Sequence, residues 1–514
     1  MAQAHPDVHA HTEAPLPASA GDTGPGELED ILASAAVAAA PLRDRHSSSR
    51  AGALRGVADA LDAAAGELVD IAINETSLSE QRLVGEVART TGQLRMFADG
   101  LDEGSWHDII IGTTTVGANG TVAAPDLRRV QRAVGPVLVF TASNFPFAFS
   151  VAGGDVASAL AAGCPIVVKV HPGHPETAIR TAAVVTRALA EAGMPAGSFA
   201  LVHGQDAGVT VLRDPRIAAA SFTGSEAGGR ALFDIANARE VPIPFFAEMG
   251  SLNPVFVSSG AVEARGESIA AGYVASFMLG LGQFCTKPGL LFLPRGHGLT
   301  DKLADALRAV APGRLLMDRI HDGHRAGRDA LAARPGVRTL VRGDLDAATA
   351  GGTLLVTDVA MLLADRRHLL TECFGPTSMV VEYADVDEAI AGARLLSGCL
   401  TATVHAEAGE DFGGQLLDEL SSRAGRLVWN GWPTGVTVSW AMHHGGPYPA
   451  TTSPEHTSVG MAAIRRFLRP VCYQDCPQEL LPDVLRDTNN SGILRRIDGS
   501  LTTADITRAD PVQT

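Results

Sequence analysis

Hydrophobic and polar positions follow two different periods along this chain. Between residues 27 and 101, Ala, Leu and Val recur every three or four positions with charged residues between them, which is the period of an amphipathic helix. This pattern predicts three helices, at 27–40, 50–72 and 78–101. The first 26 residues are rich in Ala, Pro, His and Gly without such a period, and we expect them to form a disordered tail.

The pattern changes after residue 135, where short β-branched runs alternate with helical stretches. Such alternation is typical of βαβ units, which build mostly parallel sheets covered by helices on both faces. Within one unit, 137–170, Gly153 and Gly154 open a helix and Gly163 ends it. The predicted strands are 137–140, 165–170, 219–222, 254–257, 290–293, 354–357, 378–382, 401–405 and 426–429.

These elements predict an α/β protein with two open-sheet domains and a small arm. The break between the domains is expected at 242–248, where a Pro-Ile-Pro run interrupts regular structure. The polar, turn-rich stretch 445–457 is predicted to be a long surface loop. The predicted limits are 1–26 for the tail, 27–112 with 135–247 for the first domain, 248–440 for the second, and 113–134 with 466–514 for an oligomer-forming arm.

Composition narrows the class of protein. The chain has 514 residues, of which 41 are basic and 57 acidic, giving a net charge of −16. This balance argues against nucleic-acid binding, and no apolar run is long enough for a transmembrane helix. Six cysteines without a disulfide spacing suit a reducing cytosol, and Cys472 and Cys476 lack a second Cys/His pair for zinc. We expect a cytoplasmic, multidomain enzyme without a metal.

Cys285 lies in a polar turn, Gly-Leu-Gly-Gln-Phe-Cys-Thr-Lys-Pro, between a predicted helix at 269–279 and a predicted strand. A free cysteine is usually a small buried hydrophobe, but a turn can present its sulfur to a cleft. Lys287 or a helix end could lower the thiol pKa. Cys285 is therefore the candidate nucleophile.

Two further residues could act beside such a nucleophile. Glu248 is a lone acid in an apolar stretch, either a strand-edge carboxylate in water or a partly desolvated general base with a raised pKa. Asn144 follows a buried strand, where its amide either donates to an oxyanion or forms a turn before Pro146. The residues alone leave both alternatives open.

A glycine-rich segment, Phe222-Thr-Gly224-Ser225-Glu-Ala-Gly-Gly, follows a predicted strand and opens a helix. Backbone N–H groups at such a position bind phosphate. The segment is neither a Walker A loop nor a G-x-G-x-x-G fingerprint, because Arg230-Ala231 replaces the Walker Lys-Ser/Thr. Alone, it also fits an ordinary packing turn.

Six motifs of this chain, in their order along the sequence, resemble those of the aldehyde dehydrogenase superfamily. The resemblance runs from about residue 27 to the end of the chain. The resemblance is to the superfamily's NADP-accepting branch, which includes α-ketoglutarate semialdehyde (2,5-dioxopentanoate) dehydrogenases and bacterial fatty-aldehyde dehydrogenases. The matching motifs are Ser143-Asn144-Phe145-Pro146, Val167-Val168-Lys169, Phe222-Thr223-Gly224-Ser225, Glu248-Met249-Gly250, Gln283-Phe284-Cys285 and Glu372-Cys373-Phe374-Gly375-Pro376.

The resemblance implies a Rossmann-like dinucleotide-binding domain, a catalytic domain and a bridging arm. It also implies that Cys285 attacks the aldehyde, that Asn144 and the Cys285 N–H hold the oxyanion, and that Glu248 activates water to release the acid. The remaining implied roles concern the cofactor: Lys169 for the adenosine ribose, Gly224 and Ser225 for the pyrophosphate, Glu372 for the nicotinamide ribose and Phe374 beside the ring.

The cofactor loop departs from NAD-preferring relatives, which often carry a glutamate three residues after the lysine. Here that residue is Pro172, with His171 and His174 beside it. Without a carboxylate to repel a 2′-phosphate, NADP is the expected cofactor, and NAD remains possible. A Pro172 that merely shapes the turn would allow both.

The substrate stays open at this level. The expected reaction is oxidation of 2,5-dioxopentanoate to 2-oxoglutarate; a fatty or general aliphatic aldehyde is the alternative. A CoA-acylating enzyme is disfavoured because Glu248 is present. An inactive structural homologue or a regulatory module is disfavoured because Cys285 and Asn144 are present. We expect a homodimer or homotetramer.

Overall fold

The computed structural model of the chain describes residues 21–116, 121–346 and 349–507. The N-terminal helices are α1 (Pro25–Arg43), α2 (Ser47–Ala63), α3 (Ala65–Thr76) and α4 (Glu80–Glu103). The single helix predicted at 50–72 is wrong, because Ala64 leaves helical geometry and separates α2 from α3. Regular structure also begins before residue 27, at Pro25; residues 1–20 of the predicted tail lie outside the described part.

The first sheet is fully parallel, with strand order β7-β6-β5-β8-β9. Order reverses beside β5, so the connections after β5 and β8 leave in opposite directions and open a crevice at the strands' carboxyl ends. The strands are β5 (Val137–Phe140), β6 (Ile166–Lys169), β7 (Phe199–Val202), β8 (Ala219–Thr223) and β9 (Phe245–Glu248). Its crossover helices are α5 (Gly154–Ala162), α6 (Pro175–Glu191), α7 (Gln205–Arg213) and α8 (Glu226–Asn237).

The second sheet has the order β13-β15-β16-β11-β10-β17-β18, and only β13 runs antiparallel to its neighbour. Its strands are β10 (Val255–Val257), β11 (Leu290–Pro294), β13 (Arg338–Val341), β15 (Thr353–Asp358), β16 (Thr377–Tyr383), β17 (Cys399–His405) and β18 (Ala424–Trp429). The principal covering helices are α9 (Ser259–Met278), α10 (Thr300–Arg308), α11 (Asp318–Ala332), α14 (Val386–Leu395) and α15 (Asp411–Ser421). All nine predicted strands are present in the two sheets.

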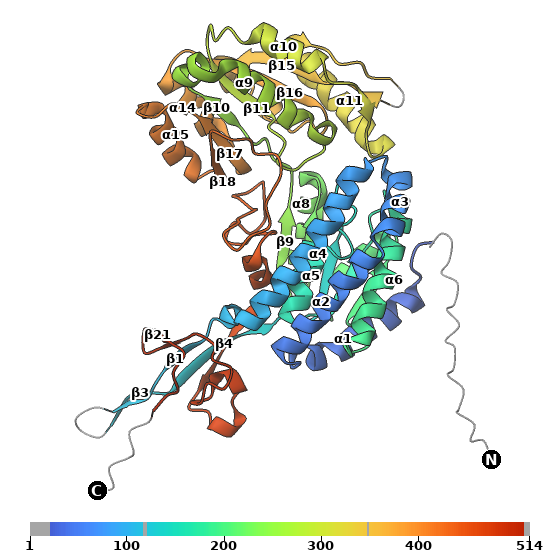
Figure 1. Cartoon of the computed structure of the whole chain (residues 1–514), viewed down its shortest axis with the longest axis vertical. Helices are drawn as coiled ribbons and strands as arrows, with labels where there is room; N and C mark the ends of the chain where they lie inside the picture. Colours follow the sequence, from blue (N-terminus) through green and yellow to red (C-terminus); the bar gives the residue numbers. More distant parts are fainter. Residues whose placement is uncertain (1–20, 117–120, 347–348, 508–514) are drawn as a thin grey trace, which may run out of the picture.

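A third sheet, β19-β4-β1-β20-β21, forms an arm that projects from the body (Figure 1). Its strands are β1 (Ile110–Gly112), β4 (Leu127–Ala133), β19 (Leu468–Gln474), β20 (Arg495–Ile497) and β21 (Ser500–Thr502), beside the small pair β2 (Thr115–Val116) and β3 (Val122–Ala124). The buried guanidinium of Arg128 lies 2.7 Å from Asp126 and 2.6 Å from Asp487, which ties β4 to the C-terminal segment. The arm thus starts before residue 113, because β1 belongs to it.

The two large sheets meet end to end. The chain passes from the carboxyl end of β9 directly to the amino end of β10, and the segments that precede β11 and β16 lie at the same edge. The segment after β18 returns to β9, where Met249 N–H donates to the Ala450 carbonyl at 2.8 Å. The surface loop predicted at 445–457 is therefore partly buried, since Thr451 and Thr457 lie inside.

No helix in the described part of the chain is both long enough and apolar enough to cross a membrane.

Candidate active site

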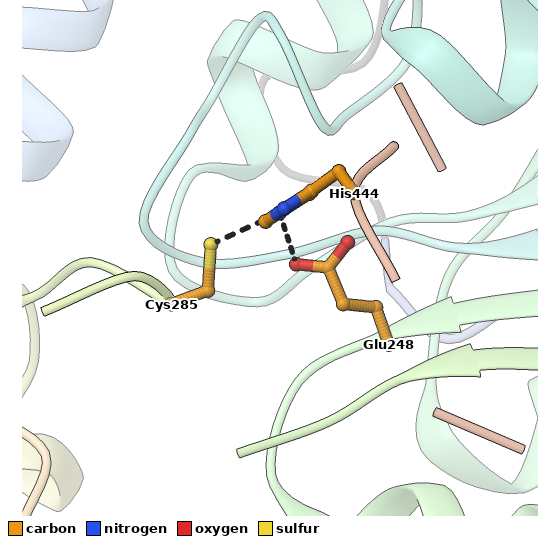
Figure 2. Close-up of side chains that lie close together, drawn as sticks. All are labelled: Glu248, Cys285 and His444. Carbon is orange, nitrogen blue, oxygen red and sulfur yellow. Dashed lines mark hydrogen bonds and ion pairs between the residues drawn. The ribbon is translucent and has the colours of Figure 1, made fainter. Parts of the chain in front are cut away.

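Cys285 lies in the turn between α9 and β11, with its sulfur facing a histidine. Its Sγ is 3.4 Å from Nε2 of His444, a residue 159 positions further along the chain (Figure 2). Asn253 fixes the turn, because its side-chain amide donates to the carbonyls of Cys285 at 2.8 Å and Lys287 at 3.0 Å. Sequence reasoning identified Cys285 but missed Asn253.

Glu248 ends β9 and completes this group. Its Oε1 lies 2.9 Å from the same His444 Nε2 (Figure 2). Its Oε2 accepts a hydrogen bond from Ser458 Oγ. Glu248 and His444 are buried, at 4 % and 1 % exposure. Of the two alternatives for Glu248, the strand-edge carboxylate in water is therefore wrong.

His444 and Ser458 were both missed from the sequence. They flank the segment 445–457, whose polar and turn-rich composition resembles that of an exposed loop. The only local signal is the pair His443-His444 before two glycines, which does not reveal a partner almost two hundred residues away. A polar loop that returns to a buried strand is a tertiary feature.

The charges in this group favour a carboxylate beside a protonated thiol. Burial and the negative charge of Glu248 raise the pKa of Cys285 well above its ordinary value, while Arg89 lowers it by less. Burial also raises the pKa of Glu248, but His444 and the hydrogen bonds around the carboxylate outweigh this effect and lower it overall. The raised pKa expected for Glu248 is therefore wrong. Cys285 therefore needs a proton acceptor before it can attack.

Lys287 does not act on Cys285 as expected. Its buried Nζ donates to the carbonyls of Cys373 at 2.6 Å, Gly375 at 3.2 Å and Thr377 at 2.8 Å. The side chain thus points away from the sulfur and fixes the segment that leads into β16. Burial lowers the pKa of Lys287. The three carbonyl oxygens accept hydrogen bonds from its three N–H groups.

Asn144 lies after β5 and reaches the Cys285 turn. Its Nδ2 donates to the Gln283 carbonyl at 2.9 Å, two residues before the nucleophile. Arg82 on α4 donates to the Asn144 carbonyl at 2.6 Å. One hydrogen bond therefore holds the side-chain amide near the nucleophile turn and another holds the backbone of Asn144. The role of Asn144 as oxyanion donor stays a prediction.

Gly224 and Ser225 are exposed at the start of α8, between the ends of β8 and β9. Ser225 caps the helix, because its Oγ accepts from Gly228 N–H at 3.3 Å. A Cβ on Gly224 would lie 2.5 Å from the Phe222 ring, so this turn excludes a larger residue. An exposed helix N-terminus at the crevice of a parallel sheet fits a pyrophosphate.

Glu372 and Phe374 precede β16 at the edge that carries Cys285. Glu372 packs on Gly250. A Cβ atom added to Gly250 would lie 2.1 Å from the Glu372 Oε2. Burial raises the pKa of Glu372 to about 7, while the charge of Lys287 opposes the rise and that of Glu226 at the start of α8 adds to it. The charges of Glu226 and Cys285 thus both interact with Glu372. Its role in holding the nicotinamide ribose stays a prediction. Phe374 is half-buried two residues on.

Lys169 ends β6, followed by His171 and the exposed Pro172. Burial and the nearby charge of Arg319, on α11 of the second domain, lower the pKa of Lys169; Asp22 acts in the opposite sense. Burial lowers the pKa of His171 to about 3, so this histidine is neutral. The positive charge at this loop comes from Lys169 and Arg319, and sequence reasoning missed Arg319.

His174, the second histidine of the loop, is completely buried and its Nε2 lies 2.9 Å from the Ala142 carbonyl. It shapes the chain before Asn144 rather than facing a cofactor.

One group of side chains in the described residues could hold a metal ion. Glu248, Cys285 and His444 offer an oxygen, a sulfur and a nitrogen within 4.8 Å of one another, a donor set that Zn²⁺ accepts. The same atoms form the nucleophile and its proton acceptors. The absence of a metal remains a prediction from the sequence. Cys472 is exposed on β19, away from this group.

Comparison with known proteins identifies the family of this chain. The family model described as "Aldehyde dehydrogenase family" matches residues 6–453. The chain belongs to the aldehyde dehydrogenase family. It is an NAD(P)-dependent oxidoreductase that acts on a small aldehyde.

Curated relatives of this aldehyde dehydrogenase include two α-ketoglutaric semialdehyde dehydrogenases. The protein from Acinetobacter baylyi is 44% identical over 459 residues, covering 88% of this chain and 87% of the relative. The second enzyme from Azospirillum brasilense is 45% identical over 461 residues, with the same coverage. An N-succinylglutamate 5-semialdehyde dehydrogenase from Chromobacterium violaceum is 31% identical over 68% of this chain and 70% of its own length.

Solved structures share the architecture. Lactaldehyde dehydrogenase from Escherichia coli superposes with a TM-score of 0.76 at 21% identity, over 88% of this chain and 91% of the other. An NAD-dependent aldehyde dehydrogenase from Sinorhizobium meliloti gives 0.74 at 22% identity, over 87% and 86%. At this identity the likeness establishes the fold.

Proposed function

We propose that this aldehyde dehydrogenase oxidises 2,5-dioxopentanoate to 2-oxoglutarate with NADP. The observation that carries the chemistry is the close approach of Cys285, His444 and Glu248. The identity of 44% and 45% to two α-ketoglutaric semialdehyde dehydrogenases, over 88% of the chain, supports the substrate. The assignment of residues to roles is part of the proposal.

In the first half-reaction, His444 accepts the thiol proton of Cys285 across 3.4 Å. Glu248, 2.9 Å from the same nitrogen, stabilises the imidazolium that forms. The thiolate then attacks the aldehyde carbon, and the Asn144 amide and the Cys285 N–H donate to the oxyanion. Burial strengthens each of these interactions because water does not compete.

Bound NADP supplies the acceptor for the hydride that leaves the substrate. For this cofactor, Lys169 and Arg319 would lie near the adenosine ribose and its 2′-phosphate, the α8 N-terminus near the pyrophosphate, and Glu372 and Phe374 near the nicotinamide. The oxidised substrate remains as a thioester on Cys285. Glu248 then takes a proton from water, and the acid leaves the sulfur.

The proposal is tested by kcat/KM for 2,5-dioxopentanoate, succinate semialdehyde, hexanal and decanal, each with NADP and NAD. We expect 2,5-dioxopentanoate with NADP to give the highest value. A highest value for decanal would instead support a fatty-aldehyde dehydrogenase.

The fatty-aldehyde alternative has one supporting observation. Phe145 lies edge-on to Phe149 and to Phe284, with ring centroids 5.3 Å apart in both pairs, beside the nucleophile turn. Such a wall suits an aliphatic chain. The guanidinium of Arg82 stacks at 5.1 Å from the Phe145 ring and 4.8 Å from the Phe284 ring, however, so the wall is not purely apolar.

A further inference from the structure

A cavity of about 430 Å³ opens between α4 and the segment that follows β18. Arg89, Gly92 and Met96 line it from α4, and residues 436–440 line it from the other side. Trp440 at this cavity is 51% exposed. The cavity therefore connects the molecular surface with the helix that carries Arg82 and Arg89.

Arg89 is the only charged residue that lines this cavity. Its Nη1 donates to the Val436 carbonyl, and its guanidinium lies 5.8 Å from the Phe149 ring centroid. Its buried Nε has no hydrogen-bond partner, and Arg89 forms no ion pair with a carboxylate among residues 21–116, 121–346 and 349–507. A half-buried guanidinium with an unused donor is suited to a ligand carboxylate.

Arg89 also lies close to the reaction centre. Its positive charge acts on Cys285 and on Glu248. Arg426 on β18 acts on Cys285 as well, but its two Nη groups already donate to the carbonyls of Gly435 and Pro433. Of the two cations, Arg89 faces the cavity and Arg426 holds the segment that closes it.

We propose that Arg89, at the cavity beside α4, binds the terminal carboxylate of the aldehyde substrate. This inference rests on the proposed function and names the residue that selects a carboxylate-bearing aldehyde. In 2,5-dioxopentanoate, three carbon atoms between the carboxylate carbon and the aldehyde carbon then separate the arginine from the sulfur. Uncharged aldehydes react without this contact.

The test compares Arg89→Met, which removes the charge but keeps the length, with Arg89→Lys, which keeps the charge. Arg95→Met is the matched control, since Arg95 is on the same helix but is exposed and paired with Asp59 and Asp62. For each protein, kcat/KM is measured with 2,5-dioxopentanoate, 5-oxopentanoate and hexanal. Glutarate is tested as an inhibitor of hexanal oxidation.

We expect Arg89→Met to lower the ratio of kcat/KM for 2,5-dioxopentanoate to that for hexanal about 30- to 1000-fold, mainly through KM. The ratio for 5-oxopentanoate should fall similarly, and the glutarate inhibition constant should rise at least tenfold. Arg89→Lys should recover part of the ratio because it keeps a point charge. Arg95→Met should resemble the wild type.

An unchanged ratio and unchanged glutarate inhibition in Arg89→Met would overturn the inference. Equal losses for hexanal and the carboxylate substrates would also overturn it, because Arg89 would then act only on the nucleophile. The proposed function fails separately, if the wild type oxidises hexanal but not 2,5-dioxopentanoate. In that case glutarate inhibition still decides the role of Arg89.

Discussion

In the proposed mechanism, His444 accepts the proton that the Cys285 thiol must lose before it can attack. Burial and Glu248 raise the pKa of the thiol, so the sulfur alone is a poor nucleophile. An imidazole nitrogen at 3.4 Å provides a nearby acceptor for its proton, and the carboxylate at 2.9 Å compensates the charge that results. These three residues form one unit, so the loss of any member should affect the others.

The first prediction separates the two half-reactions. His444→Gln should lower the rate of the pre-steady-state burst of reduced cofactor by about 10²–10⁴-fold and move its rise to higher pH, since the thiol must then ionise without a base. Glu248→Gln should keep a burst near one per active site but slow the turnover that follows, because deacylation loses its base. Stopped-flow absorbance measures both.

Ser458→Ala is the matched control for these variants, because it removes one hydrogen bond to Glu248 and no proton acceptor. A fast burst in His444→Gln would mean that another group takes the thiol proton. Full steady-state activity in Glu248→Gln would contradict its role as the base for water.

The second prediction concerns Glu372 and the stability of the fold. Its pKa is about 7 in the folded protein, above its ordinary value of 4.5. The folded state therefore binds this proton more tightly than the unfolded state. The contribution of the bound proton to the free energy of unfolding is complete below pH 4.5 and is lost as pH rises through 7. Glu372→Gln should therefore be more stable than the wild type at pH 8, by up to about 3 kcal/mol.

Denaturant unfolding from pH 4.5 to 8 measures this difference, which should vanish at the acidic end. Glu263→Gln, an exposed change on α9, is the control. A constant difference across this range would show that Glu372 titrates normally.

At the scale of elements, the local pattern predicted nine of the twelve strands in the two large sheets and missed β7, β9 and β13. The nine strands named from β-branched runs are present, because runs such as Ile166-Val167-Val168 are buried on both faces of a sheet and are apolar throughout. The helix break at Ala64 falls within the alanine run 63–65, and its one local signal, Gly66, lies inside the next helix. The α4 side chains that reach the active site were also missed, because the long-range contacts of Arg82 and Arg89 leave no local signal.

The third prediction concerns the choice between NADP and NAD, for which the β6–α6 connection and α11 both supply residues. Lys169 and Arg319 come from different domains, and no carboxylate occupies position 172. We expect kcat/KM for NADP to exceed that for NAD. Arg319→Met should reduce the ratio about tenfold, and Pro172→Glu should reverse it, because the new carboxylate faces the 2′-phosphate.

Initial rates with both cofactors measure these ratios at a fixed aldehyde concentration. Arg325→Met, further along α11, is the control for Arg319→Met. A wild type that strongly prefers NAD would contradict the cofactor assignment, and an unchanged ratio in Arg319→Met would remove Arg319 from it.

At the scale of the whole molecule, two surfaces remain open in a single copy of the chain. β18 ends the second sheet, and no other strand within 21–116, 121–346 and 349–507 pairs with its outer edge. Leu427 and Trp429 on this strand are 37% and 47% exposed. The projecting arm carries Leu494 and Leu501, exposed by 46% and 58% (Figure 1). Unprotected edges and exposed apolar side chains favour association, and two such surfaces on each copy can close a symmetric dimer.

The last prediction is that the arm of one copy covers β18 of another. Size-exclusion chromatography with light scattering should then give a dimer or tetramer for the wild type. Two double variants should each give a monomer with unchanged circular dichroism: Leu427→Glu with Trp429→Glu, and Leu494→Glu with Leu501→Glu. Each variant places charged side chains where the interface would bury them, and burying an unpaired charge is costly. Val241→Glu, at a residue 69% exposed elsewhere, should leave the mass unchanged. A monomeric wild type, or dissociation by only one of the two pairs, would show that the arm and β18 do not meet.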